Sequence, residues 1–223
     1  MSNRACAWRH HLPVRSPFTP APRGSISSQP QSTPQKDPDL SGFLGFGRRA
    51  RQERTGFSLY TAAVGAARDP YLFTEIAAPD TLDGRFDIIG LYVFLVIQRL
   101  KREPEPGPAW AQAVFDAMFS DMDVNLREMG VGDMVVGRRV RAMWEAFHGR
   151  ALAYSEPMAI GDMPALEAAL ARNIWRGAPP PNAASPAALA RLMIAQESCL
   201  SAQPIQDLGA GTVHFLPARE ATQ

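Results

Sequence analysis

Apolar residues recur at steps of three and four positions over most of the chain after residue 55, a period that predicts helices rather than strands. The predicted helices cover residues 57–68, 86–102, 110–129, 134–154, 164–175 and 185–200. Asp69-Pro70 ends the first of them and begins a further turn, because Pro suits a first helical position. Residues 213–216 could add a short strand, for which the pattern offers no partner. The predicted fold class is all-α, a single domain of about six or seven helices.

Residues 110–154 predict a helical hairpin with a short glycine turn at its bend. Its first helix carries one apolar stripe, made of Phe115, Met118, Phe119, Met122, Leu126 and Met129. Gly130 is expected to end this helix in a left-handed conformation, which glycine adopts at little cost. Asp133 is expected to cap the next helix by accepting from its free N–H groups.

The first 54 residues differ in composition from the remainder of the chain. They are rich in Pro, Ser and Arg and hold nine Lys and Arg against three acids, which leaves fourteen against nineteen in the remainder. Such a segment buries too little apolar surface to offset the entropy of ordering. We therefore expect a disordered basic tail at 1–54, a helical domain at 55–200 and a C-terminal tail at 201–223.

Two alternatives concern this basic tail. Its acid-poor composition resembles a mitochondrial transit peptide, although its prolines favour a plain disordered tail or an over-extended start codon. Within it, residues 42–54 are aromatic and then basic, which is compatible with a flexible lead-in or with a contact to an anionic membrane surface.

Composition excludes several classes of protein. A mildly acidic body argues against direct DNA binding, which needs a dense basic face. Cys6 and Cys199 are the only cysteines, too few for a disulfide framework or a thiolate metal cluster. The longest apolar run, residues 88–97, is far shorter than the roughly 20 residues that span a bilayer. It predicts a core helix, with an in-plane membrane contact as the alternative.

Catalytic and metal-binding patterns are weak. Asp121 and Asp123 resemble an Asp-x-Asp metal motif, but residues two apart on a helix diverge by about 200° and cannot chelate one ion. His148 has no second histidine or cysteine at ligand spacing, which favours a hydrogen-bonded surface side chain. No nucleophile elbow, phosphate loop or dinucleotide fingerprint occurs. The sequence therefore predicts no enzyme, no metal site and no cofactor.

Charged side chains crowd the hairpin instead and are the candidate partner-binding residues. They are Asp116, Asp121, Asp123, Arg127, Glu128 and Asp133, together with Arg85 in the turn before the core helix. Asp123 with Arg127, and Arg141 with Glu145, are spaced to form ion pairs. For any single residue the alternative is a structural role: Asp133 and Asp83 as caps, Arg85 as a clasp between loop and helix, and the others as solvated charge.

The same hairpin carries a resemblance to a known family. It contains Phe119-Ser120-Asp121-Met122-Asp123-Val124-Asn125-Leu126-Arg127-Glu128-Met129-Gly130-Val131-Gly132-Asp133 and ends on Phe147-His148-Gly149-Arg150-Ala151-Leu152-Ala153-Tyr154. A second block is Pro79-Asp80-Thr81-Leu82-Asp83-Gly84-Arg85-Phe86-Asp87. Both blocks resemble the ubiquinol-cytochrome c chaperone family, over about residues 57–175. The sequence departs at Tyr92, where many members have a histidine.

The resemblance implies a helical assembly chaperone that binds newly made cytochrome b, or its nascent chain, and supports assembly of ubiquinol-cytochrome c reductase. It implies as further partners a second assembly factor or the ribosome, and a peripheral contact with the membrane. The expected location is the bacterial cytoplasm at the inner face of the membrane, or else the mitochondrial matrix face. An adaptor that docks on the translation machinery or on another assembly factor is the alternative, and a small-molecule enzyme is the third reading.

Overall fold

The computed structural model describes the backbone from Leu40 to Gln223 and the side chains from Gly47 onward. Nine helices cover this part of the chain, and six of them have seven residues or more. They are α1 (Leu40–Ala67), α2 (Tyr71–Thr74), α3 (Leu82–Lys101), α4 (Gly107–Glu128), α5 (Asp133–Ile160), α6 (Met163–Ile174), α7 (Ser185–Ala202), α8 (Ile205–Gly209) and α9 (Ala218–Ala221). No strand occurs between residues 40 and 223, so the all-α prediction is confirmed.

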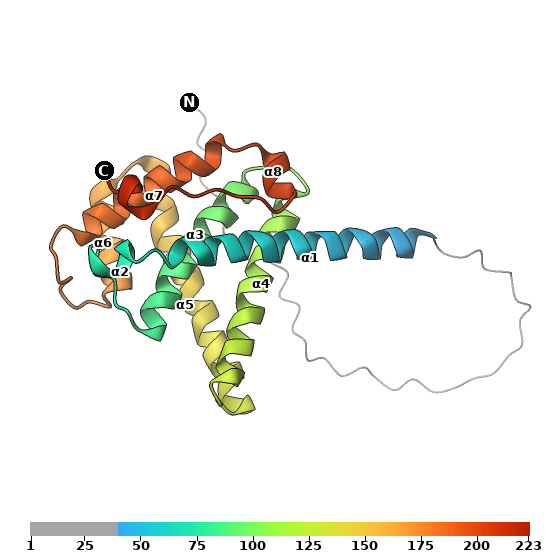
Figure 1. The fold of residues 1–223 in the computed structure, drawn as a ribbon, viewed down its shortest axis with the longest axis horizontal. Helices are drawn as coiled ribbons and strands as arrows, with labels where there is room; N and C mark the ends of the chain where they lie inside the picture. Colours follow the sequence, from blue (N-terminus) through green and yellow to red (C-terminus); the bar gives the residue numbers. More distant parts are fainter. Residues whose placement is uncertain (1–39) are drawn as a thin grey trace, which may run out of the picture.

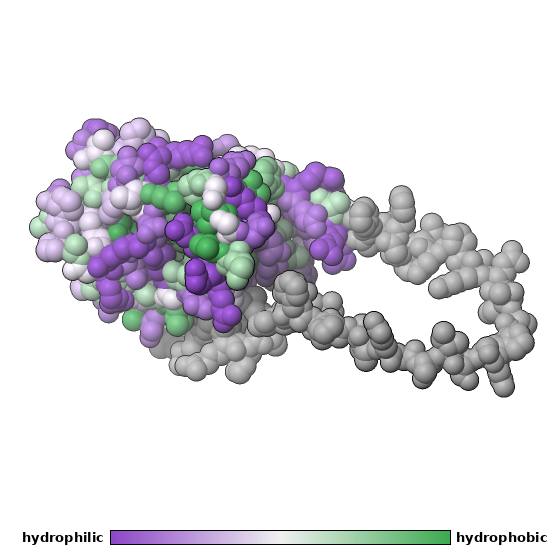
Figure 2. Space-filling view, turned by 90° about the horizontal axis from the view of Figure 1, so that it is seen from below, coloured by the Kyte–Doolittle hydropathy of each residue, from purple (hydrophilic) through white to green (hydrophobic). Residues whose placement is uncertain are grey.

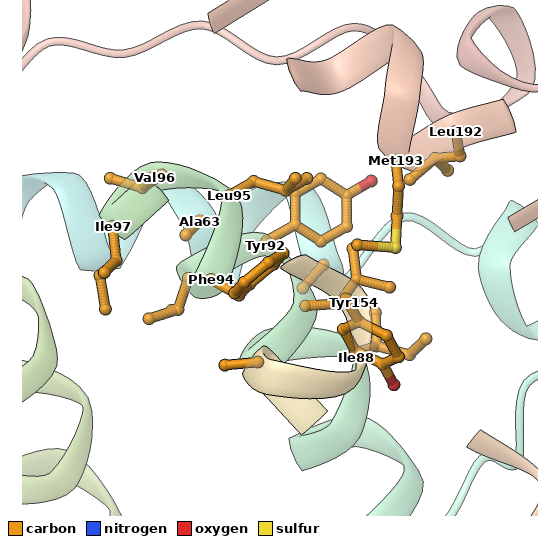
Figure 3. Close-up of a cluster of buried hydrophobic side chains, with 14 of the residues drawn as sticks. Ala63, Ile88, Tyr92, Phe94, Leu95, Val96, Ile97, Tyr154, Leu192 and Met193 are labelled. Carbon is orange, nitrogen blue, oxygen red and sulfur yellow. The ribbon is translucent and has the colours of Figure 1, made fainter. Parts of the chain in front are cut away.

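Helix α3 forms the centre of the core, as its apolar run predicts. It contacts α1 and α4 on one side and α6 and α7 on the other (Figure 1). Figure 3 shows Tyr154 of α5 and Met193 of α7 beside Ile88 and Tyr92 of α3. A helix that is apolar on all sides is stable when it is buried on all sides. None of the described helices is long and apolar enough to cross a membrane.

Tyr92, where the sequence departs from the family pattern, is part of this core. Only 1% of its surface is exposed, and its ring lies edge-on to Phe215 with the centroids 5.2 Å apart. Burial raises the pKa of the Tyr92 hydroxyl, so this position is neutral and structural.

Helices α4 and α5 form the predicted hairpin, and Gly130 takes the predicted left-handed conformation at φ +77°. The predicted cap at Asp133 is wrong. Gly132 occupies the N-cap without a side-chain hydrogen bond, and Asp133 is the first residue of α5. The Asp133 carboxylate is instead paired with Arg127 across the bend, which keeps it away from the helix N–H groups. Asp83 does not cap α3 either, because the Thr81 hydroxyl accepts from the Gly84 N–H.

Helix α1 begins much earlier than predicted. The flexible lead-in expected at residues 42–54 is helical, so the boundary at residue 55 is too late. Residues within 49–54 line a groove against α4, and at Gly56 the helix crosses α4 so closely that an added Cβ would lie 2.5 Å from the Cβ of Ala113. The residues in this contact are small, so they produce no periodic pattern of large apolar residues in the sequence. Residues 1–39 of the predicted tail lie outside the described part of the chain.

The predicted C-terminal tail packs on the domain. Its extended segment is held by glutamine side chains instead of a partner strand: Gln196 bonds the backbone of Leu216, and Gln203 bonds that of His214. Arg191 donates to the Thr222 carbonyl, and the Ala218 N–H donates to Asp69. Residues 213–216 form no strand, and the sequence does not predict that the tail packs, because these pairings join residues far apart in sequence.

Candidate functional site

A groove of about 660 Å³ opens between α1, α3, α4 and α5. Its apolar lining comes from all four helices and the turn at α2: Val64, Phe73, Leu82, Phe86, Ile89, Met122, Leu126, Met129 and Met143. Leu82 is 59% exposed and Met129 is 51% exposed, so the apolar lining continues onto the rim. The groove is large enough for bulky apolar side chains of another molecule.

Asp121 forms part of the groove wall with Tyr60. The Tyr60 hydroxyl of α1 donates to the Asp121 carboxylate of α4 over 2.6 Å. Burial raises the pKa of Tyr60, and the acceptor Asp121 raises it further, so the phenol stays a proton donor. Asp123 points elsewhere and pairs with Arg127, which agrees with the divergence expected for residues two apart.

Arg85 is the predicted clasp between the loop and α3. Its Nε lies 2.5 Å from the Asp80 carboxylate, and its guanidinium carbon lies 5.4 Å from the centroid of the Phe73 ring. The hydrogen bond to Asp80 raises the pKa of Arg85. Both partners of the ion pair are more than half exposed, so the pair contributes little to stability and keeps one face of Arg85 on the groove.

Charges of both signs surround the apolar lining. The cations are Arg68, Arg85 and Arg139, and the anions are Asp83, Asp121 and Glu128. An apolar surface with a mixed polar rim is the usual composition of a surface that binds a polypeptide. The face of the hairpin in Figure 2 shows the same mixture of hydrophilic and hydrophobic residues.

The predicted site residues fall into three groups. Arg85, Asp121 and Glu128 line the groove. Asp123, Arg127 and Asp133 form an ion-pair triad at the tip of the hairpin, where the hydrogen bond that Arg127 donates to Asp123 raises the pKa of Arg127.

Asp116 lies in a second, broader groove of about 1170 Å³ between α1 and α4, and accepts a hydrogen bond from Gln112 over 2.7 Å. The cluster that is continuous in sequence is therefore divided in space.

A buried charged centre is the main feature that the sequence did not reveal. The Asp87 side chain of α3 has no exposed surface, and its carboxylate lies 2.8 Å from Arg150 of α5 and 3.3 Å from Arg176 after α6. Burial raises the pKa of Asp87 to about 6, although both arginines oppose the shift. Asp87 lies in one of the two blocks that resemble the family and Arg150 lies in the other. This shared position in the resemblance was the signal in the sequence that could have pointed to the pair. Spacing alone does not show that three distant segments meet.

Other polar groups offer little chemistry. Between residues 47 and 223 no three His, Cys, Asp or Glu side chains gather closely enough to hold a metal ion. The His148 ring lies 2.9 Å from the Trp144 carbonyl, in agreement with the hydrogen-bonded side chain expected at this position, and its centroid lies 4.0 Å from that of the Trp144 ring. The predicted Arg141–Glu145 pair is present at 3.1 Å.

The fold and the groove define an all-helical domain with a mixed apolar and charged surface of the kind that binds a polypeptide. The chain belongs to the ubiquinol-cytochrome C chaperone family, whose model matches residues 74–215.

Solved and curated relatives agree with this assignment. A crystal structure of the Cbp3 homolog from Brucella abortus is similar, with 30% identity and a TM-score of 0.69 over 81% of this chain and 98% of that one. The ubiquinol-cytochrome-c reductase complex assembly factor 1 of Xenopus laevis is 28% identical over 116 residues, which are 52% of this chain and 58% of the relative. Its Homo sapiens counterpart is 27% identical over 118 residues, 53% of this chain and 38% of the relative. The match thus spans less than two thirds of these curated relatives.

Proposed function

We propose that this chain is an assembly chaperone that holds newly made cytochrome b and supports assembly of ubiquinol-cytochrome c reductase. Membership of the chaperone family supports the role in assembly. The observation that carries the finer proposal is the groove, whose apolar lining extends to exposed rim positions at Leu82 and Met129. A membrane protein that has not yet been assembled exposes apolar segments, and such a groove would shield one of them from water.

The charged rim would add selectivity. Arg85, Asp121 and Glu128 sit beside the apolar lining, where they would contact polar residues that flank an apolar client segment. The triad at the hairpin tip would then be a second contact, for the same client or for another assembly factor or the ribosome. Because the client is a membrane protein, the chaperone would act at the membrane face on which cytochrome b is made.

The test compares two exposed leucines. Leu82 and Leu152 are both 59% exposed, but only Leu82 lines the groove. A glutamate at either position loses little buried surface, so Leu82→Glu and Leu152→Glu should both keep the melting temperature of the wild type. In cells that depend on this chain, Leu82→Glu should lower the cytochrome b that co-purifies in mild detergent and lower the reductase content, whereas Leu152→Glu should change neither.

Two outcomes would contradict the proposal. If Leu82→Glu retains full co-purification and full reductase content, the groove does not hold the client. If both variants lose binding equally, client contact is spread over the surface and is not a property of the groove.

A further inference from the structure

Methionine side chains make up most of the hairpin side of the groove. Helices α4 and α5 run side by side to their bend (Figure 1). Together they contribute four large apolar side chains to the groove lining: Met122, Leu126, Met129 and Met143. Leu126 is only 4% exposed. The apolar surface that the hairpin offers to a bound segment therefore comes mainly from three thioethers.

Two of these methionines lie on one side of α4. Met122 and Met129 are seven residues apart, which is about two helical turns or about 10 Å along the axis. Met143 reaches the same groove from α5. Met129 is 51% exposed at the rim, whereas Met122 and Met143 are half-buried. A small solute in the surrounding water thus reaches the Met129 side chain directly and the other two less readily.

Other methionines of the chain differ from these three in exposure or in place. Met118 and Met193 have no exposed surface, so a solute reaches them only when the fold opens. Met134, in the first turn of α5, is 93% exposed but does not line the groove. Met134 is therefore a natural control, because it reacts with a solute at least as readily as Met129 and lies outside the binding surface.

The reaction that distinguishes methionine from other apolar side chains is oxidation by a peroxide. The thioether sulfur attacks one peroxide oxygen, an S–O bond forms as the O–O bond breaks, and the other oxygen leaves as water. The sulfur is oxidised by two electrons and the peroxide is reduced. The product, methionine sulfoxide, is polar. If an apolar segment covers the sulfoxide oxygen, this oxygen loses its hydrogen bonds to water, which disfavours binding.

We propose that Met129 is a modification site at which oxidation by peroxide lowers the affinity of the groove for its client, with Met122 and Met143 as slower secondary sites. Flexible, polarisable thioethers adapt to apolar segments of different shape, and the same sulfur atoms make the groove sensitive to an oxidant. Methionine sulfoxide reductases reverse the reaction, so the loss of affinity is reversible. The inference rests on the proposed function, because it assigns a regulation to the same groove.

The experiment uses the immobilised full chain, which is treated with hydrogen peroxide and washed before a mild-detergent extract that contains cytochrome b is added. The washing step keeps the oxidant away from the client. Peptide mass spectrometry measures the sulfoxide at Met129, and the captured cytochrome b measures binding. Full conversion of Met129 should lower the affinity for cytochrome b roughly tenfold relative to the untreated chain.

Two pairs of variants locate the effect. Met129→Gln places a polar side chain at the rim and should lower the affinity without any oxidant, whereas Met134→Gln should not. Both side chains are exposed, so both variants should keep the melting temperature of the wild type. Met129→Leu keeps the apolar character and removes the sulfur, so it should bind normally and lose much less affinity on oxidation. Met134→Leu should lose as much affinity on oxidation as the wild type.

Reversal of the effect identifies the oxidised group. Peroxide also oxidises cysteine thiols, and the chain contains Cys6 and Cys199. Dithiothreitol alone reduces oxidised thiols, so after this treatment the affinity should stay low. Dithiothreitol together with the A and B methionine sulfoxide reductases, one for each sulfoxide epimer, should restore it.

Three results would overturn the inference. Met129 is converted to the sulfoxide and the affinity does not change, Met129→Gln binds cytochrome b like the wild type, or Met134→Leu protects the chain as well as Met129→Leu does. If the untreated chain captures no cytochrome b, the proposed function fails and the inference fails with it. If the untreated chain captures cytochrome b and the oxidised chain captures as much, only the inference fails.

Discussion

At the scale of single residues, Asp87 is a carboxylate buried in the core. The fold removes a carboxylate completely from solvent and places one arginine from α5 and one from the segment after α6 beside it. Desolvation raises the pKa of Asp87 more than the two arginines lower it, so the pKa rises to about 6 from an ordinary value of 3.8. The ion pairs thus connect three segments of the chain, while the buried charge itself costs stability at neutral pH.

This environment gives a prediction with a definite sign. A carboxyl group with a raised pKa in the folded state stabilises the fold below its unfolded pKa and loses that contribution as the pH rises through its folded pKa. Between about pH 4 and pH 7 the wild type should therefore lose stability relative to Asp87→Asn, by at most about 3 kcal/mol at 1.4 kcal/mol per pKa unit. Urea unfolding of both proteins at several pH values measures the difference. A wild type that gains stability relative to Asp87→Asn over this range would show that the arginines dominate.

The hairpin-tip triad, unlike Asp87, should contribute little to the stability of the fold and should act as a surface for a partner. Arg127 and Asp133 are exposed and Asp123 is half-buried, so Asp123→Ala with Arg127→Ala should change the free energy of unfolding by under about 1 kcal/mol. If the tip contacts a partner, assembled reductase in cells should fall. Melting temperature and reductase content are the two measurements. If the double variant keeps full reductase content, the triad is only solvated surface charge. If the double variant unfolds, the triad is a structural network.

At the scale of elements, the crossing of α1 and α4 depends on one glycine. A Cβ at Gly56 would lie 2.5 Å from backbone and side-chain atoms of Ala113, whereas a Cβ at Gly65 in the same helix meets nothing within 4 Å. Gly56→Ala must push the two helices apart, at a cost of roughly 1 to 3 kcal/mol. Gly65→Ala should instead stabilise the protein by up to about 1 kcal/mol, because alanine is the better helix former. Thermal unfolding of the two variants measures the difference. Equal shifts in melting temperature would mean that α1 and α4 do not approach each other closely at Gly56.

Elements with a period in their own sequence were predictable, and elements fixed by distant contacts were not. The core helix α3 and the α4–α5 hairpin carry apolar repeats and glycine signals, so their existence follows from local chemistry. The crossing of α1 and α4 depends on small residues, and the groove depends on four helices meeting, neither of which leaves a local pattern. Of the candidate site residues, Arg85, Asp121 and Glu128 line the groove. The sequence assigned Met122, Leu126 and Met129 to one apolar stripe, but it did not predict that they line a groove.

At the scale of the whole molecule, the C-terminal segment completes the core. Leu208, Val213, Ala218 and Ala221 are buried, and Phe215 packs on Tyr92 of the central helix. The Thr55 hydroxyl of α1 also donates to the Gly209 carbonyl over 3.0 Å, which ties the last part of the chain to the first described helix. These contacts close the domain around α3.

The two ends of the chain, both predicted to be tails, should therefore respond differently to deletion. Removal of residues 204–223 uncovers the core and leaves the buried Gln196 side chain without its partners at Leu216, so the free energy of unfolding should fall by roughly 3 kcal/mol or more. Removal of residues 1–39 should leave thermal unfolding unchanged, because their composition supplies almost no apolar period. Urea and thermal unfolding of both shortened chains against the full chain test the contrast. A C-terminal deletion as stable as the full chain would mean that this segment only lies on a core already complete, and a marked loss on deleting residues 1–39 would mean that they pack on the domain.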